Sequence, residues 1–201
     1  MESDLQLHIA PFDELTVRTL WGIVRLRQEV FYLEQQVDCA DWDAVDPQSV
    51  CVWIEAAGEP VGFLRIVPPG LVYAEASIGR VAVAAAHRRQ GIARRMMTEA
   101  LQYIARTWQL PVRISAQEYI VPFYEQLGFE TVSELYMEAG IPHRKCCANS
   151  YGTCGYRTFG RRRFVGGGLV AEAAGARGHR PLHGQLARHD RYARGRLSVA
   201  R

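Results

Sequence analysis

The sequence predicts an α/β (α+β) domain, in which strands and helices alternate along the first three-quarters of the chain. The clearest observation is the segment 78–107, where a β-type apolar run is followed by a basic loop and then by apolar residues at helical spacing. Similar changes of periodicity recur on both sides of this segment. No apolar run approaches the roughly 18 residues that a membrane span needs. A globular domain that combines a sheet with amphipathic helices is therefore expected.

The predicted strands are short runs rich in β-branched and other apolar residues, bounded by glycine or proline. Pro11 ends the first strand, and the turn Gly58-Glu59-Pro60 separates two runs that are expected to pair as a hairpin. Pro68-Pro69-Gly70 marks a firm loop. In chain order the expected strands span residues 5–9, 50–56, 61–67, 74–83, 112–116, 129–137 and 141–147.

Three helices are predicted from apolar residues that repeat at three- and four-residue steps. Asp13 is the expected N-cap of the first helix, which runs to about Phe31 and is followed by an acidic loop up to Pro47. The second helix begins at Ile92, and the third spans 118–126 with Gly128 as its expected C-cap. The resulting order is β–α–β–β–β–α–β–α–β–β, with an optional short helix in the acidic loop.

The junction before the second helix predicts an anion site. The first turn of a helix leaves backbone N–H groups without partners, and the helix dipole makes that end positive. Gly91 permits close approach of a ligand to the backbone, and Arg88 and Arg89 add positive charge. The sequence lacks both G-x-x-x-x-G-K-[ST] and G-x-G-x-x-G, which argues against a nucleoside-triphosphate loop and a dinucleotide fold. A different phosphorylated cofactor is therefore expected.

The run Arg88-Arg89-Gln90-Gly91-Ile92-Ala93 resembles the R/Q-x-x-G-x-G/A signature of the GNAT superfamily, the acetyl-CoA-dependent N-acetyltransferases. The run 122–129, PFYEQLGF, is similar to that family's F-Y-x-x-L-G-F segment. The resemblance covers about residues 5–145 and implies the GNAT fold, a mixed, mostly antiparallel twisted sheet with helices on both faces. Segments 26–31, 34–35, 78–81, 116–117 and 140–143 look like the ElaA-type subgroup.

The resemblance also implies the chemistry, in which an amine attacks the thioester carbonyl of acetyl-CoA directly. Tyr124 matches the tyrosine that many members use to protonate the leaving thiolate, although packing a helix on the sheet is an alternative role. Many members carry a glutamate as general base where this chain has Gly79. Glu75 is the catalytic carboxylate that we assign, while Glu34, Glu118, His143 and a water chain remain open as alternatives.

The resemblance implies three sets of contacts in the site. Backbone groups of a strand hold the pantetheine arm, and the loop holds the pyrophosphate. Residues in the helix-to-loop region and near the later strands form the acceptor pocket, where four aspartates could attract a cationic amine or simply be solvated. The expected cofactor-binding residues are Val81, Ala82, Val83, Arg88, Arg89, Gln90, Gly91, Ile92 and Ala93. The expected substrate-binding residues are Arg27, Glu34, Gln117 and His143. The four aspartates are Asp38, Asp41, Asp43 and Asp46.

Charge divides the chain into two regions. Residues 1–149 hold 13 basic and 19 acidic residues, whereas residues 150–201 hold 11 arginines and two acids. We expect an acetyltransferase domain over 1–147 and a basic Arg/Gly-rich extension over 148–201. The extension is either disordered or an out-of-frame translation, and Arg161-Arg162-Arg163 leaves a nucleic-acid patch as a further alternative.

The expected function is transfer of an acetyl group from acetyl-CoA to a small-molecule or protein amine, without a metal ion. The alternative is a catalytically silent acyl-CoA-binding module, associated with nucleic acid through its basic tail. Five cysteines without a C-x-x-C pair fit reduced thiols in the cytoplasm, and the acidic N-terminus does not resemble a signal peptide. A monomer or homodimer without membrane or nucleic-acid partners is expected.

Overall fold

The computed structural model describes residues 5–36 and 40–149. These residues form an eight-stranded sheet in the order β1-β2-β3-β4-β5-β8-β6, with β7 paired to β8. Only the β4–β5 pairing in this part of the chain is parallel, so the predicted mixed, mostly antiparallel sheet is confirmed. The strands are β1 (Leu5–Pro11), β2 (Val50–Ala56), β3 (Glu59–Val67), β4 (Ala76–Val83), β5 (Val112–Gln117), β6 (Glu130–Thr131), β7 (Tyr136–Glu138) and β8 (Ile141–Ala148).

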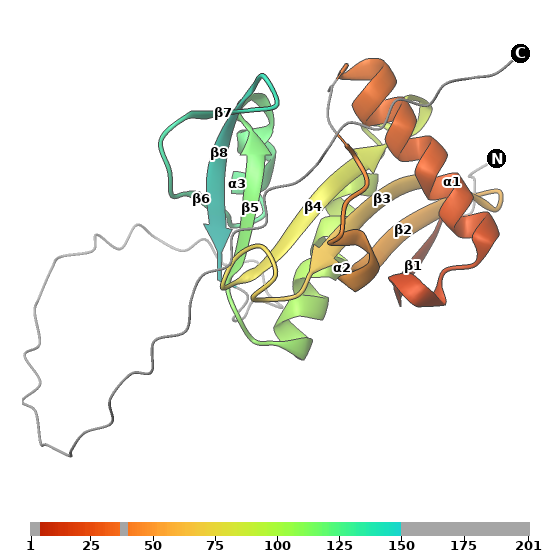
Figure 1. Ribbon diagram of the computed structural model, residues 1–201, viewed down its shortest axis with the longest axis horizontal. Helices are drawn as coiled ribbons and strands as arrows, with labels where there is room; N and C mark the ends of the chain where they lie inside the picture. The colour runs from red at the N-terminus through yellow and green to blue at the C-terminus, as the bar shows by residue number, and fades with distance from the viewer. Residues whose placement is uncertain (1–4, 37–39, 150–201) are drawn as a thin grey trace, which may run out of the picture. The chain divides into compact units, whose positions relative to one another are not determined.

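Helices cover both faces of the sheet, as Figure 1 shows for α1 and α2. Side chains alternate between faces along a strand, so Trp53 meets α1 through Ile23, while Ile54 belongs to the core beneath Met96 of α2. The longer helical elements are α1 (Val17–Arg27), the π-helical η2 (Gln28–Glu34), α2 (Ile92–Thr107) and α3 (Val121–Glu125). The short 3₁₀ turns are η1 (Phe12–Glu14), η3 (Asp46–Gln48), η4 (Ala85–His87) and η5 (Glu118–Ile120).

The predicted cap of the first helix was wrong. Asp13 lies in the 3₁₀ turn η1, and α1 begins four residues later at Val17. Thr16 has the extended backbone of an N-cap, and its Oγ1 accepts a hydrogen bond from the Thr19 N–H at 3.1 Å. Threonine is also among the preferred N-cap residues, and Thr16 caps the helix in place of Asp13.

The predicted strand over 129–137 was also wrong, because it divides into β6 and β7. Val132 still donates its N–H to the Lys145 carbonyl at 2.8 Å, which is a ladder contact. The Lys145 N–H, however, donates to Ser133 Oγ at 2.8 Å rather than to a strand carbonyl. A serine side chain thus takes the place of a backbone acceptor and ends the ladder.

The start of α2 lies close against β3. A Cβ built at Gly62 would lie 2.7 Å from Cγ2 of Ile92, so any larger residue there would push the first turn of α2 away from the sheet. Ile92 and Met96 are almost fully buried at this contact. The packing therefore fixes where the N-terminus of α2 lies.

The strands β4 and β5 separate soon after they meet. They pair only at Ala76 with Val112 and at Ser77 with Arg113. Figure 1 shows the two strands close at one end and apart at the other. Arg80 has a positive φ of 55°, where the β3–β4 register shifts. Beyond Ser77, the edge of β4 that faces β5 pairs with no strand among the residues that the structure describes. The backbone groups along this edge therefore remain available to a ligand.

The predicted boundary between the domain and the tail falls inside β8, which continues through Ala148. Cys146 is 1% exposed and belongs to the core of the sheet. Residues 150–201 lie outside the described residues, so the expectations for the basic extension stay predictions.

Candidate functional site

A cavity of about 1150 Å³ lies where β4 and β5 diverge. Its wall at one end comes from the loop before α2 and from the first turn of that helix. At the other end the wall comes from β5, β7 and β8, and the side toward η2 includes Gln35, Asp41 and Trp42. A single cavity thus joins the predicted cofactor residues to the predicted acceptor residues.

The first end is built from the N-terminus of α2. Gly91 is the N-cap, with a left-handed φ of 79°, and no side chain caps the helix. The first helical hydrogen bond runs from the Arg95 N–H to the Gly91 carbonyl at 2.9 Å. The amides of Ile92, Ala93 and Arg94 therefore precede the helical ladder and are open to an anion. Gly91, Ile92 and Ala93, three of the residues that the sequence analysis assigned to the cofactor, line the cavity.

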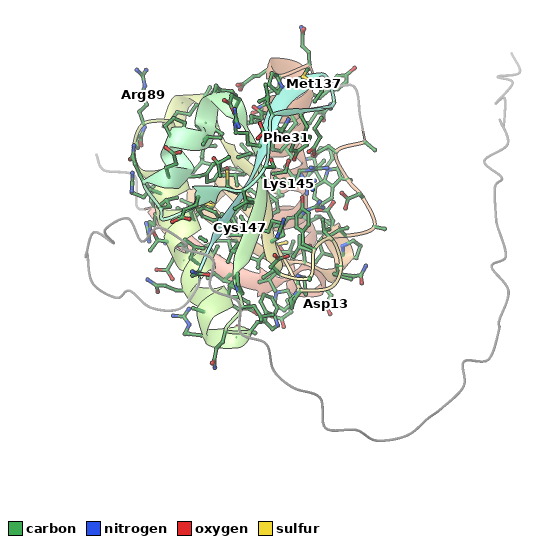
Figure 2. All side chains as sticks on the ribbon, turned by 90° about the vertical axis from the view of Figure 1, so that its left-hand side faces the viewer. Asp13, Phe31, Arg89, Met137, Lys145 and Cys147 are labelled. Atoms are coloured by element: carbon green, nitrogen blue, oxygen red, sulfur yellow. The ribbon has the colours of Figure 1, made fainter. Side chains whose placement is uncertain are left out.

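The arginines near this helix end have different tasks. Arg88 donates from Nη2 to Glu34 at 2.6 Å and from Nε to the Val83 carbonyl at 3.0 Å, so it fastens the loop to β4 and η2. Arg89 projects outward in Figure 2 and lines the cavity mouth. Arg94 was missed by sequence reasoning. It lines the cavity from the first turn of α2 and donates to Gln126 at 2.6 Å.

The predicted contacts on β4 lie on two sides of the strand. Val81 and Val83 line the cavity. Ala82 is 2% exposed and packs beneath α1 with Phe63, so only its backbone is suited to a ligand. Gln90 is exposed, and its side chain donates to the Ala86 carbonyl at 3.2 Å, which closes the loop on itself.

Tyr124 lines the cavity from α3, between Phe123 and Phe129. Its ring contacts both phenylalanines edge-on, so the helix-packing role predicted as an alternative is also present. Burial raises the pKa of its hydroxyl to about 12. Tyr124 therefore keeps its proton at neutral pH and can donate a hydrogen bond into the cavity.

Glu75, the assigned catalytic carboxylate, lies in the loop before β4 and is absent from the cavity lining. Arg113 donates to it from Nη2 at 2.6 Å and from Nε at 3.1 Å. These hydrogen bonds lower the pKa of Glu75, which makes it a weaker proton acceptor. The position of Glu75 thus offers no support for its predicted role.

Three of the four predicted substrate-binding residues line the cavity, and the fourth is buried away from it. Arg27 is fully buried beneath Trp42, whose ring centroid lies 3.7 Å from its guanidinium carbon, and it does not line the cavity. Glu34 lines the cavity but is paired with Arg88. Gln117 and His143 both line the cavity, on the neighbouring strands β5 and β8.

The acidic loop is neutralised by arginines. Arg27 contacts Asp41 at 2.8 Å and the buried Asp46 at 2.7 Å, while Arg65 forms two hydrogen bonds with Asp43. Arg80 adds a contact with Asp41 at 2.9 Å. The Arg65 hydrogen bonds lower the pKa of Asp43 to about 2. With three arginines against three aspartates, this network offers no surplus negative charge to attract a cation; Asp38 lies outside the described residues.

Sequence reasoning missed a polar cluster on β5 and β7. Ser115 donates to Glu138 at 2.7 Å, and the Tyr136 hydroxyl lies 2.6 Å from the Ser115 hydroxyl. Ser115 and Glu138 line the cavity. The alternation of Tyr136 and Glu138 in a short strand was the available signal, but their proximity to Ser115 depends on the pairing of β8 with both strands.

The separated strands and the uncapped helix that faces them form a site suited to a phosphorylated ligand with an extended arm. Residues 21–145 match the family model described as an acetyltransferase (GNAT) domain. The chain belongs to this GNAT acetyltransferase family.

Relatives give the same assignment. The chain is 33% identical to Protein ElaA of Escherichia coli over 135 residues, which are 65% of this chain and 87% of ElaA. It is 32% identical to a UPF0039 protein of Schizosaccharomyces pombe over 144 residues, 70% of this chain and 95% of that protein. Among solved structures, an acyl-CoA N-acyltransferase from Pseudomonas aeruginosa superposes with a TM-score of 0.69 at 31% identity, covering 72% of this chain and 99% of that one.

The predicted resemblance to the ElaA-type subgroup and the predicted fold are thereby confirmed. No helix of the described ranges is long and apolar enough to cross a membrane. Within the same ranges, His, Cys, Asp and Glu side chains form no group of three or more that could hold a metal ion.

Proposed function

We propose that this protein is an acetyl-CoA-dependent N-acetyltransferase, which moves the acetyl group to an amine by direct attack in a ternary complex. The observation that carries the proposal is the uncapped N-terminus of α2, which opens into the cavity between the separated strands. Open amides at a helix N-terminus favour a diphosphate, and the free edge of β4 is suited to the amide-containing pantetheine arm. The cofactor contacts that we propose are Val81, Ala82, Val83, Arg89, Gln90, Gly91, Ile92, Ala93 and, in addition, Arg94.

The proposed role of Tyr124 is to hold the departing sulfur by a hydrogen bond. A thiol has a reference pKa of about 8.5, and the pKa of Tyr124 is about 12. Complete transfer of the phenolic proton would therefore be uphill by about 5 kcal/mol. A hydrogen bond to the developing thiolate needs no such transfer, and coenzyme A then takes its proton from water.

The proposal extends to the setting of the protein. The described cysteines Cys51, Cys146 and Cys147 are free thiols. Burial raises the pKa of Cys51 to about 12, which keeps this thiol protonated and unreactive. Free thiols are typical of reducing compartments, so we propose a cytoplasmic enzyme.

Two measurements test the proposal. Calorimetry of the full chain with coenzyme A is expected to show saturable binding at one site. Thiol release from acetyl-CoA, followed with a panel of primary amines, is expected to exceed hydrolysis. Absence of coenzyme A binding by the folded chain would overturn the proposal. Binding without release for any amine would instead establish the catalytically silent module.

A further inference from the structure

The strands β5, β7 and β8 present a polar surface to the cavity. Alternation along each strand places Ser115 and Gln117 of β5 on the same face as His143 of β8 and Tyr136 and Glu138 of β7. The opposite face holds the apolar core with Ile114, Ala116 and Cys146. Four of these residues line the cavity, and Tyr136 supports them through its contacts with Ser115 and Glu138. We call the five polar residues the acceptor wall.

The ring of His143 is held by a hydrogen bond at Nδ1, which leaves Nε2 open to the cavity. Its side chain is buried, at 8% exposure, and Nδ1 lies 2.8 Å from the Ile141 carbonyl oxygen. A carbonyl can only accept, so Nδ1 carries the hydrogen and the neutral ring presents a lone pair at Nε2. Nε2 has no hydrogen-bond partner in the described part of the chain, and His143 lines the cavity.

The carboxylates that sequence reasoning offered as bases are all occupied by arginines. Glu75 is paired with Arg113. Glu34 accepts from Arg88 and Glu118 from Arg144, each at 2.6 Å. An arginine thus occupies one oxygen of each carboxylate, and neither Glu75 nor Glu118 lines the cavity. Among the residues proposed from the sequence, His143 is therefore left as the group with a free basic atom in the cavity.

Glu138 differs from these carboxylates because its hydrogen-bond partners are hydroxyl groups and not arginines. Its Oε2 accepts hydrogen bonds from the hydroxyls of Ser115 at 2.7 Å and Tyr136 at 3.3 Å. No described arginine, lysine or histidine lies within 4.0 Å of its carboxylate, so its negative charge is not neutralised by an ion pair. The nearby Lys145 lies instead over the rings of Tyr73 and Tyr136. Glu138 therefore offers the cavity a negative charge.

Strand register places these two groups at a distance that suits an amine. Tyr136 lies opposite His143, and Glu138 lies opposite Ile141, so Glu138 and His143 are diagonal neighbours on one face. Such neighbours have backbones about 7–8 Å apart, and an ammonium group fits between their side chains. The groups that face His143 from the adjoining strands are Gln117, Tyr136 and Glu138, with Lys145 further along its own strand.

We propose that the acceptor wall binds a cationic primary amine, with Glu138 holding its ammonium group and His143 Nε2 removing its proton. This inference rests on the proposed acetyl transfer. The proton passes from R–NH₃⁺ to Nε2, and the freed electron pair forms the N–C bond with the thioester carbonyl. The C–S bond then breaks, its electrons leave with sulfur, and the second N–H proton is released to water.

The variants His143→Gln and Glu138→Gln test the two roles. The controls are His8→Gln on the distant strand β1 and Glu130→Gln at an exposed position of β6 that does not line the cavity. At saturating acetyl-CoA and a panel of simple alkylamines, His143→Gln is expected to lower kcat by about 10²- to 10⁴-fold. It is also expected to abolish the acidic limb of the kcat/KM profile against pH. Glu138→Gln is expected to raise KM for the amine by about 10- to 100-fold, with a smaller change in kcat. Both controls are expected to retain wild-type kinetics.

A weakly basic acceptor amine distinguishes two roles of His143, the removal of a proton from the amine and a purely structural role. Methoxyamine is neutral at assay pH, so it is expected to react with the His143→Gln variant nearly as fast as with wild type. Unchanged pH profiles in His143→Gln, or an unchanged KM in Glu138→Gln, would overturn the assignment. Coenzyme A binding by calorimetry is expected to be equal in all variants. A wild-type chain that binds coenzyme A but acylates no amine of the panel would overturn the acceptor wall while leaving the cofactor site intact.

Discussion

The two ends of the cavity differ in the atoms that they offer to a ligand. At the cofactor end the contacts are mainly backbone amides, fixed by the left-handed Gly91 and by the close packing of α2 on β3. At the proposed acceptor end the groups open to a ligand are side chains from three strands. Backbone contacts tolerate substitution of side chains, whereas side-chain contacts define one acceptor chemistry. For the proposed enzyme, the comparison teaches that the cofactor end would set the reaction and the acceptor end the substrate.

The largest effect is expected from Arg27→Met, which disrupts the buried charge network that holds the acidic loop against α1. The substitution removes the 2.7 Å partner of the buried Asp46, which then keeps Arg65 at 3.0 Å, and it also removes the 2.8 Å partner of Asp41. Breaking a buried ion pair costs about 3–5 kcal/mol, and we expect the free energy of unfolding in urea to fall by that amount. Arg25→Met, in the same helix but exposed, is the matched control and should change stability by less than about 0.5 kcal/mol. Equal losses for the two variants would contradict the network as a structural support.

The substitution Tyr124→Phe is expected to have the next largest effect, on kcat alone. It removes a hydrogen bond to a developing charge, which is worth about 1.5–3 kcal/mol or roughly 10- to 100-fold in rate. Stability should barely change, because packing of the ring between Phe123 and Phe129 is preserved. Tyr103→Phe on α2 serves as the control. The kcat of each variant is measured from the rate of thiol release from acetyl-CoA. An unaltered kcat in Tyr124→Phe would show that its role is packing.

Gly91→Val tests the backbone character of the cofactor end. A branched residue at the φ of 79° costs about 1–2 kcal/mol, so coenzyme A should bind roughly 5- to 30-fold more weakly. Gly58 has nearly the same φ, 80°, in a turn with open space around it. Gly58→Val should lower stability by a similar amount and leave coenzyme A affinity unchanged in calorimetry. Weakened binding in both variants would point to general destabilisation instead.

The smallest effect is expected on the free energy of unfolding at acidic pH, to which Asp43 of the acidic loop contributes. Because the pKa of Asp43 is lowered to about 2, its ion pair with Arg65 stabilises the fold fully above its ordinary value of 3.8. That contribution is lost as the pH falls from 3.8 toward 2. Asp43 is partly exposed, so solvent screening keeps the effect below about 1 kcal/mol. Urea unfolding of Asp43→Asn should show a shallower loss of stability over this window than wild type, and parallel curves would contradict the pairing.

Sequence periodicity was sufficient for the elements that bury one continuous face. The second helix was predicted to begin at Ile92, and α2 begins there, because Gly91 and the apolar spacing are both local signals. The hairpin of β2 and β3 was predicted for the same reason. The division of 129–137 into β6 and β7 was not predicted, because it depends on the contact of Ser133 with Lys145 on another strand. The cap of α1 was placed at Asp13 although the contact of Thr16 with Thr19 is local.

By itself the sequence determined the order of strands and helices up to α3, the family and the glycine loop before α2. These features are written in short stretches, where a glycine, a cap or an apolar spacing acts on its own neighbours. The tertiary structure alone decided that the aspartates of the acidic loop are neutralised by Arg27, Arg65 and Arg80, and that Glu138 lies near His143. The physical reason is that charges and hydrogen bonds act over a few ångströms, and only the folded sheet brings residues from separate strands within that distance.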